Sequence, residues 1–386
     1  MRLVIIEIVD WFDLESLRAS KVENFESKPI IVSPSSSVSE IIGTLQRNDA
    51  YEVFVEDGAK TGTVTLRDIL KTQDISMKCS SIMVPLSKLS PNETIGKVAR
   101  LMSDYRLRAL PIGRERRIDG AVTIQVLCQS LLSIKEFGQM RVDKIMKRDP
   151  VTVDKRDSFS KARSLMAKHG IDHLPVLDSG NLCGILLSSQ IVASMFPKER
   201  LPKGTLSGET AGYSDVKVQG LMDVTILAFG PEEKASTVLR NMLEQHKTYA
   251  IVKLWDELQG IVTYRDFVGL LAEPEELDIP AYLVGLPDDP FEAHLAQDKF
   301  IREARTLRRS FPTIQEIRAT IKTKKVSSGK QRYEVSVSIT TPGKAHAYSA
   351  EGWSLPIVFD DIGDKMKRLL AKKSDNRRRE SIRKIS

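Results

Sequence analysis

The sequence predicts an α/β protein built from tandem repeats, followed by a smaller α+β domain, and three observations support this fold class. The order strand, helix, strand, Gly-led strand and short helix (β-α-β-β-α) occurs four times in the first 280 residues. Residues 281–373 follow a different order, βαβββα. The charge is also uneven, because residues 281–386 hold 22 Lys and Arg against 13 Asp and Glu, a balance of +9, whereas the first 280 residues have a balance of −2.

Each repeat is marked by an apolar strand and by a strand that begins with glycine. The four pairs of strands are 53–55 with 62–68, 110–112 with 120–124, 174–177 with 184–188, and 250–252 with 260–266. Because such copies pack against one another, we expect two paired modules, at residues 25–134 and 140–272, in place of a single catalytic cleft. A stretch rich in Gly and Pro at 197–215 is interpreted as a linker, and residues 1–24 receive no role.

The last domain, residues 281–373, is expected to be a two-layer sandwich. Asp289 and Pro290 predict a helix start, because Asp caps a helix and Pro fits its first position. Apolar and polar side chains alternate in residues 317–322 and 332–339, which is typical of strands with one buried face. We predict two helices on one face of a four-stranded, mostly antiparallel sheet, followed by a basic tail at 374–386.

The composition is that of a soluble globular protein, with 41% hydrophobic and 28% charged residues. Cys79, Cys128 and Cys183 are far apart and odd in number, so neither a disulfide framework nor a metal site is expected. The amino-terminal run meets acidic residues too early for a signal peptide, and no stretch is long enough to span a bilayer. A cytoplasmic protein without a membrane partner is expected.

The pattern Gly-x-x-Thr-x-x-Asp occurs twice, with its polar residues at Thr65 and Asp68 and again at Thr263 and Asp266. One interpretation is structural. A Thr followed three residues later by an acid forms a capping box at a helix start, and such a cap needs no ligand.

The second interpretation comes from a resemblance. The four repeats resemble cystathionine β-synthase (CBS) domains, which pair into Bateman modules whose clefts bind adenosine nucleotides. The resemblance implies that Asp68 and Asp266 accept hydrogen bonds from ribose hydroxyls, a role that suits a group with acceptors only. It places Thr65 and Thr263 near the phosphates of AMP, ADP or ATP, and it suggests a homodimer through the modules. The further candidate nucleotide contacts are Arg67, Arg108, His173 and Arg265.

Two repeats depart from the motif. The second keeps Thr123 but has Val126 at the Asp position, and the third has Leu187 and Gln190 at the two polar positions. If the repeats pair in order, each module therefore retains one candidate site.

Residues 281–373 resemble the ribosome hibernation-promoting factor and ribosome-associated inhibitor family, in their βαβββα order and in a closing helix that contains Phe359-Asp360 and Asp364-Lys365-Met366. The resemblance implies binding to rRNA in the mRNA and tRNA channel of the small ribosomal subunit. Basic side chains on a rigid wedge suit this role, because folded RNA is recognised mainly through phosphates and shape. The expected RNA contacts are Lys299, Arg302, Arg309, Lys322, Lys324, Lys325, Lys330, Arg332, Lys365, Arg368, Lys372, Lys373, Arg377, Arg378 and Arg379.

The sequence holds no recognisable catalytic pattern, since its five His residues form no metal-binding spacing and neither a P-loop nor a nucleophile elbow occurs. A non-enzyme is expected. The leading hypothesis is a ribosome-binding, translation-silencing factor whose CBS modules sense adenine nucleotides or add ribosome contacts. The alternatives are a CBS-regulated RNA- or DNA-binding regulator and a non-catalytic allosteric subunit of an enzyme.

Overall fold

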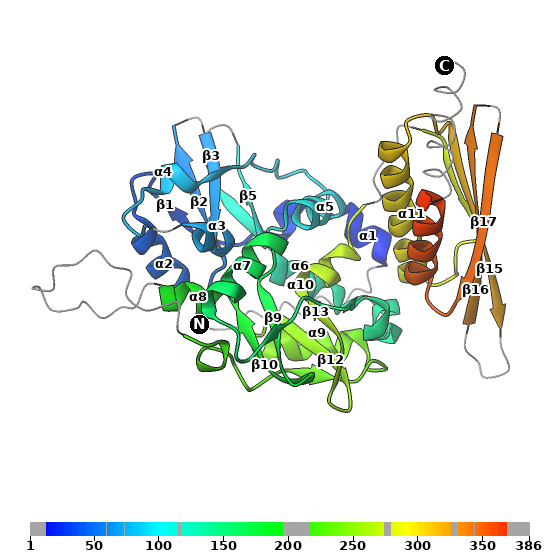
Figure 1. Ribbon diagram of the computed structural model, residues 1–386. Coiled ribbons are helices and arrows are strands. Elements are labelled where there is room, and N and C mark those ends of the chain that lie inside the picture. Colours follow the sequence, from blue (N-terminus) through cyan, green and yellow to red (C-terminus); the bar gives the residue numbers. More distant parts are fainter. Residues whose placement is uncertain are drawn as a thin grey trace, which may run out of the picture. The chain divides into compact units, whose positions relative to one another are not determined.

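The computed structural model describes residues 13–58, 60–72, 74–114, 117–195, 216–273, 279–325, 331–342 and 344–368. The chain divides into two compact units, Met1–Ala272 and Glu273–Ser386, and each is described by itself (Figure 1). Residues 1–12 of the amino-terminal segment, the linker predicted at 197–215 and the tail at 374–386 lie outside the described residues.

The first unit repeats one order of elements four times. The first repeat contains β1 (Ile31–Val32), α2 (Val38–Arg47), β2 (Glu52–Asp57), β3 (Lys60–Thr65) and α3 (Leu66–Lys71). The second contains α5 (Ile95–Tyr105), β5 (Ala109–Ile112), β6 (Gly120–Thr123) and α6 (Ile124–Leu131). The third contains β8 (Val153–Asp154), α7 (Phe159–His169), β9 (His173–Asp178), β10 (Asn181–Leu187) and α8 (Ser188–Met195). The fourth contains β11 (Ala228–Phe229), α9 (Ala235–Glu244), β12 (Tyr249–Leu254), β13 (Glu257–Thr263) and α10 (Tyr264–Gly269).

Local sequence explains how each repeat forms its helix. In the first repeat, Ser37 caps α2 and Glu40 completes a capping box, while Val38, Ile41 and Leu45 fall on one buried face. Thr94 caps α5 and Ser158 caps α7 by accepting a backbone hydrogen bond, from Lys97 N and Lys161 N, but neither helix has the acid that completes a capping box. The strands β1, β8 and β11, which lead the first, third and fourth repeats, each pair in parallel with the next strand. In the second repeat a single parallel bridge from Leu89 to Ile112 takes this place, and the hairpin that follows is antiparallel in all four.

The segments that precede the repeats are exchanged within each pair. The strand β4 (Val84–Pro85), which precedes the second repeat, pairs with β3 of the first. The strand β7 (Lys147–Arg148), which precedes the third repeat, pairs with β13 of the fourth. A side chain at Gly62 would stand 2.9 Å from Val84 O, and one at Gly260 would stand 2.8 Å from Lys147 O. The sequence predicts that this glycine begins its strand, but Gly62 lies inside β3 and Gly260 lies inside β13. A glycine is needed there because the backbone of the other repeat passes directly over it.

The amino-terminal segment, for which no role is predicted from the sequence, supplies the same kind of leading segment. After helix α1 (Leu14–Ala19), residues 22–25 form a 3₁₀ turn, and Lys21 bridges Thr94 at the start of α5. Arg18 Nη2 donates to the carbonyl oxygen of Leu270 at 2.8 Å. The described part of this segment is therefore built into the second and fourth repeats.

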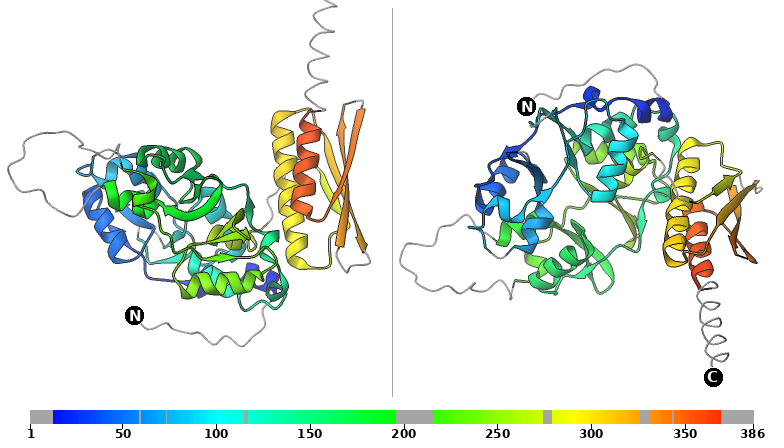
Figure 2. Two further views of the ribbon diagram at one scale, coloured as in Figure 1. Left: turned by 60° about the horizontal axis from the view of Figure 1, so that its bottom comes forward. Right: turned by 90° about the horizontal axis from the view of Figure 1, so that it is seen from above.

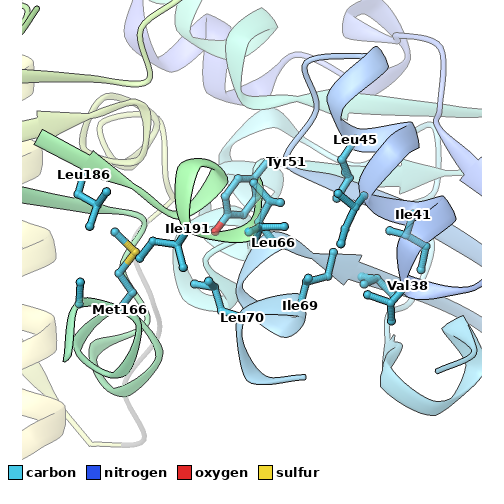
Figure 3. Packing of buried hydrophobic residues seen from close by; sticks show 14 of the residues in the cluster. Val38, Ile41, Leu45, Tyr51, Leu66, Ile69, Leu70, Met166, Leu186 and Ile191 are labelled. Carbon is cyan, nitrogen blue, oxygen red and sulfur yellow. The ribbon is translucent and has the colours of Figure 1, made fainter. Parts of the chain in front are cut away.

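The two modules pack against each other through their helices. The helix α3 of the first repeat contacts α7 and α8 of the third, and α10 of the fourth repeat contacts α5 and α6 of the second. One hydrophobic core joins the first and third repeats, and Figure 3 shows Leu70 of the first beside Met166 and Ile191 of the third. The helical faces of the modules thus meet within one chain.

The second unit is a four-stranded sheet with two helices on one face. Its elements are β14 (Ala281–Val284), α11 (Pro290–Ser310), β15 (Glu316–Lys325), β16 (Gln331–Thr341) and β17 (Lys344–Gly352), followed by helical residues 355–368. The strands lie in the order β14-β15-β16-β17, with β14 and β15 parallel and the other neighbours antiparallel. Figure 2 shows α11 and the second helix side by side on the same face of the sheet.

The core of this unit lies between the sheet and the helices. The alternating residues of β15 and β16, such as Ile317, Ala319 and Val335, point inward and are fully buried. Phe300 of α11 and Phe359 of the second helix meet above them with their ring centres 6.1 Å apart. The other face of the sheet carries no helix among the described residues.

We expect Met166→Ala to reduce the free energy of unfolding of the first unit by about 2–5 kcal/mol, because the truncation leaves a cavity in the shared core. Hydrogen exchange should show lost protection in the first repeat as well as in the third. The control is Trp255→Ala, since Trp255 is 86% exposed. A loss confined to the third repeat would contradict the shared core.

Candidate functional site

The four repeats bring one equivalent residue each to the centre of the first unit. The loop between the helix and the hairpin of every repeat contains one residue with a positive φ, and the residue two places later points to the centre. The positive-φ residues are Asp49, Arg106, Gly170 and His246. The residues two places later are Tyr51, Arg108, Asp172 and Thr248. Equivalent positions thus carry four different polar side chains.

Asp172 lies at this centre and contacts side chains of all three other repeats. Its side chain is 2% exposed, and its Oδ1 accepts a hydrogen bond from the hydroxyl of Tyr51. Its Oδ2 faces three guanidinium groups, with Arg108 Nη2 at 3.5 Å, Arg265 Nη2 at 3.9 Å and Arg67 Nη1 at 4.0 Å. Each of these arginines comes from a different repeat. One carboxylate therefore ties all four repeats together, since Asp172 itself belongs to the third.

Further contacts fix the arginines. The guanidinium of Arg108 lies 3.8 Å from the centre of the Tyr51 ring, a cation–π contact. Arg67 donates to the carbonyl oxygens of Gly170, at 3.2 Å, and of Arg106. Arg106 in turn donates to the carbonyl oxygen of His169 at 2.7 Å. Arg67 therefore joins the first, second and third repeats through backbone as well as charge.

Burial governs the ionisation of the central groups. It raises the pKa of Asp172 to about 7, an effect that the guanidinium of Arg265 opposes. Burial together with Arg108 and Arg265 holds the pKa of His173 well below its usual value, so His173 is neutral and shares a hydrogen bond with Thr248 Oγ1 at 2.7 Å. Burial also raises the pKa of Glu52 to about 7. Glu52 Oε1 accepts from the backbone N–H of Arg108 at 2.7 Å, and its Oε2 is buried without a hydrogen-bond partner among the described residues.

A large cavity lies beside Thr65 and Asp68. Its volume is about 630 Å³, and its wall combines apolar side chains such as Leu101 and Leu110 with charged ones. The basic lining residues outnumber the acidic ones by five to two, and they are Arg67, Lys71, Lys88, Lys97 and Arg106 against Asp68 and Glu93. This size and lining suit a small anionic ligand with an apolar ring.

The motif of the first repeat forms the capping box and also faces this cavity. Asp68 Oδ2 accepts from Thr65 N at 3.0 Å and from Thr65 Oγ1 at 2.7 Å. The second carboxylate oxygen, Asp68 Oδ1, lies 3.7 Å from Nζ of the exposed Lys71. The cap thus uses one oxygen of Asp68, and the two interpretations of the motif are compatible.

A smaller cavity lies beside Thr263 and Asp266. Its volume is about 100 Å³, and Arg108, Asp172, His173 and Arg265 also line it. Asp266 Oδ2 accepts from Thr263 N at 2.7 Å and from Thr263 Oγ1 at 2.8 Å. Burial raises the pKa of Asp266. The same motif therefore borders two cavities of very different size, and residues of other repeats contribute to the lining of both.

The structure places all eight predicted nucleotide contacts at these two cavities. Thr65, Arg67 and Asp68 line the large one. The small cavity is lined by Arg108, His173, Thr263, Arg265 and Asp266. In the third repeat, Gln190 Oε1 accepts from Leu187 N at 2.7 Å, so Gln190 replaces the capping carboxylate. Tyr51, Glu52, Arg106 and Asp172 were missed by the sequence analysis. An alignment of the repeats with one another would have indicated that Tyr51 and Asp172 share the position of Arg108 and Thr248.

Many of the predicted RNA contacts of the second unit are paired with acids. The pairs are Lys299 with Asp360, Arg302 with Asp298, Lys324 with Glu334, Arg332 with Glu351, and Lys365 with Asp361. Arg309, Lys322 and Arg368 are exposed. The side chain of Lys325, together with Lys330, Lys372, Lys373, Arg377, Arg378 and Arg379, lies outside the described residues. The described part of the second unit therefore exposes less unpaired positive charge than its number of Lys and Arg residues suggests.

Within the described ranges, His, Cys, Asp and Glu side chains form no group of three that could hold a metal ion. The helices in that same part of the chain include none with the length and hydrophobicity needed to cross a bilayer.

We expect the stability of the wild type to fall relative to Glu52→Gln as the pH rises from 4.5 to 7. The raised pKa means that the folded state holds the Glu52 proton more tightly than the unfolded chain, so its stabilising contribution is lost over this range. The difference should reach on the order of 2–3 kcal/mol. Urea unfolding at a series of pH values measures it. The exposed Glu257→Gln is the control, and parallel curves for wild type and Glu52→Gln would contradict the burial effect.

The comparisons with known proteins agree with the repeated architecture of the first unit. Residues 22–74, 79–132 and 142–196 match the family model of the CBS domain. An uncharacterised protein of Methanocaldococcus jannaschii, MJ1404, is 26% identical over 356 residues, which covers 89% of this chain and 84% of that protein. An inosine-5'-monophosphate dehydrogenase of Korarchaeum cryptofilum is 27% identical over 195 residues, which covers 47% of this chain and 36% of the enzyme.

A solved structure supports the fold of the first unit. MJ1225 of Methanocaldococcus jannaschii, described as a candidate archaeal homologue of γ-AMPK, superposes with a TM-score of 0.58 at 17% identity. The match covers 66% of this chain and 100% of that protein. The fourth repeat, outside the three matched segments, has the same order of elements as the third. The chain therefore contains CBS domains, at residues 22–74, 79–132 and 142–196.

Proposed function

We propose that the four repeats act as a sensor of adenine nucleotides, and that the main ligand site is the cavity beside Thr65 and Asp68. The observation that carries this proposal is the combination of a cavity of about 630 Å³ with a carboxylate at its wall. Ligand pockets in proteins commonly have about 300–1,000 Å³. The resemblance to CBS domains supplies the class of ligand.

Asp68 is suited to hold the ribose of such a ligand. Its Oδ1 is not used by the capping box and pairs loosely with Lys71 at 3.7 Å. A ribose diol can replace Lys71 at this oxygen, because hydroxyl donors form shorter and better directed hydrogen bonds to a carboxylate. The cap meanwhile keeps the carboxylate in a fixed orientation.

The charge around the cavity favours a phosphorylated ligand over a free nucleoside. The buried Arg67 and the exposed Arg106 both line it, and Lys71, Lys88 and Lys97 are its other basic lining residues. Leu101 and Leu110 offer apolar surface for a base. The second motif, at Asp266, borders only about 100 Å³, so the proposal assigns the nucleotide to the first cavity.

The sensor is proposed to act on the second unit, which begins at Glu273 directly after the last repeat. The positive balance of residues 281–386 supports RNA binding, and the resemblance to hibernation factors suggests the small ribosomal subunit as the partner. The protein would then silence translation without catalysing a reaction. The homodimer suggested by the sequence stays a prediction, since the helical faces of the modules are paired within this chain.

A second candidate function is a regulatory subunit of an enzyme. It is favoured by the acidic partners of the cations in the second unit, which reduce its attraction for RNA. In that case an affinity-purified protein would carry an enzyme with it in place of ribosomal proteins.

We expect Asp68→Ala to weaken the binding of AMP, ADP or ATP by about 1.5–3 kcal/mol, because a charge-assisted contact to the ribose is lost. Isothermal titration calorimetry measures the change. Glu40→Ala is the matched control, since it removes the capping acid of α2 in the same repeat but lies outside the cavity. Equal affinity in wild type and Asp68→Ala would exclude the ribose contact, and a wild type that binds none of the three nucleotides would exclude the sensor.

We expect the full chain to sediment with small ribosomal subunits in a sucrose gradient at low salt, and to be released as salt rises because phosphate contacts release counterions. Charge reversal at the exposed residues Arg309, Lys322 and Arg368 should shift the protein to the soluble fractions. Reversal at the exposed Lys60 of the first unit is the control. A wild-type chain that stays soluble at low salt would rule out the ribosomal function.

A further inference from the structure

The sheet of the second unit has one short edge and one long edge. The edge strand β14 has four residues and directly follows Pro280, and a short edge with a neighbouring proline is protected from pairing with another chain. The opposite edge strand, β17, has nine residues and therefore extends about 30 Å. It pairs with β16 on one side, and no strand lies on its other side among the described residues (Figure 1).

The strand β17 lacks the features by which proteins usually protect a long edge. Its pairing with β16 runs from Lys344 to Gly352 without a change of register, so no bulge bends the strand away. Residues 345–350 contain no Lys, Arg, Asp, Glu or Pro. A strand of another chain can therefore reach the free side of β17 and pair with its backbone.

The second helix, residues 355–368, borders the same edge. A side chain at Gly352 would stand 2.9 Å from Val358, and Lys365 Nζ lies 4.7 Å from the centre of the Tyr348 ring. The helix therefore runs back along β17, from the end of the strand toward its start. Because residues three or four apart share one face of a helix, Lys365 marks a face that lies beside β17. The other residues of this face are Ile357, Asp361 and Arg368.

One end of this edge is basic and the other is acidic. Lys344 and Arg368 lie toward the start of β17, whereas Glu351 and Asp361 lie toward its end, and all four are exposed. A two-fold axis across the middle of β17 places the basic end of one copy against the acidic end of the other. Both acids already pair with a cation of their own chain, so contacts across the axis extend these pairs. The edge is therefore complementary in charge to a second copy of itself.

Exposed apolar side chains lie at the acidic end of the edge. Trp353 directly follows β17 and is 52% exposed, and Ile357 is 44% exposed. Exposed aromatic side chains are typical anchors of protein interfaces. In the antiparallel arrangement, these two side chains of each copy lie beside the start of β17 in the other copy, where contact removes them from water.

We propose that β17 is a self-association edge, at which two copies of the chain pair their β17 strands in antiparallel orientation and join their sheets into one. A second copy is favoured over a strand of a different protein because the edge matches itself in charge. Nucleic acid is disfavoured by the acids at one end. This interface differs from the dimer through the CBS modules that the sequence suggests, and it depends on neither nucleotide nor ribosome binding.

The test is sedimentation velocity of the full chain over a range of concentrations. We expect a monomer–dimer equilibrium in the wild type. Ala347→Lys should raise the Kd of the dimer at least about tenfold, because like charges then meet across the axis. Ser336→Lys is the matched control and should dimerise as the wild type does. Ser336 is exposed on the same face of the sheet as Ala347, but it lies on the inner strand β16.

Charge exchange at the two ends of β17 tests the direction of pairing. Lys344→Glu should weaken the dimer, because the new acid meets Glu351 of the second copy. The double variant Lys344→Glu with Glu351→Lys should restore the dimer, and a double variant weaker than the single one overturns the antiparallel arrangement. Hydrogen exchange of residues 344–352 should also be slower in concentrated than in dilute wild-type protein.

The outcomes separate this edge from other interfaces. A wild type that stays monomeric at the highest concentration overturns the proposal. A dimer that Ala347→Lys leaves intact also overturns it and would place the interface elsewhere, as in the CBS modules. Loss of the dimer in both lysine variants would assign it to the open face of the sheet instead of the edge. If Ala347→Lys fails to fold, the wild type decides, and unchanged hydrogen exchange of residues 344–352 on dimerisation overturns the edge.

Discussion

The close passage of one backbone over another, at glycines inside the second hairpin strands of the first and fourth repeats, is the constraint on which the first unit depends. Gly62 and Gly260 leave room for the segments that precede the neighbouring repeats. These segments form β4, which pairs with β3 of the first repeat, and β7, which pairs with β13 of the fourth. This exchange fixes the first repeat to the second and the third to the fourth. It also sets the position of the cavities, because β4 and β7 carry Val84 and Lys147 to their walls.

The repeats themselves could be predicted from the sequence because their pattern is local. A glycine, an apolar run and a Thr-x-x-Asp pair are each visible in the printed chain, and the family match confirms CBS domains in three segments. The strand alternation at Ile317 to Ile339 likewise follows from side chains that must face either a core or water. The resemblance of this second unit to hibernation factors stays a prediction.

The centre of the repeats could not be predicted in the same way. Tyr51, Arg108, Asp172 and Thr248 share a position but not a residue type, so no motif marks them. The two cavities illustrate the same point, because identical Thr and Asp residues border about 630 Å³ in one module and about 100 Å³ in the other. Residues of another module line both cavities, Arg108 the small one and Ala167 the large one, and no local motif indicates them. Pairing of cations with acids in the second unit, as between Lys324 and Glu334, also arises only in the folded sheet.

The meeting of both modules inside one polypeptide has a consequence for symmetry. An assembly of two identical two-repeat chains would place every central residue twice, related by a two-fold axis. Four repeats in one chain are not related by exact symmetry. They can therefore place a single carboxylate opposite three arginines, and one cavity can be large while the other is small. Fusion of the modules in one chain therefore permits equivalent repeats to carry different residues and cavities of different size, which a symmetric pair of identical subunits does not permit.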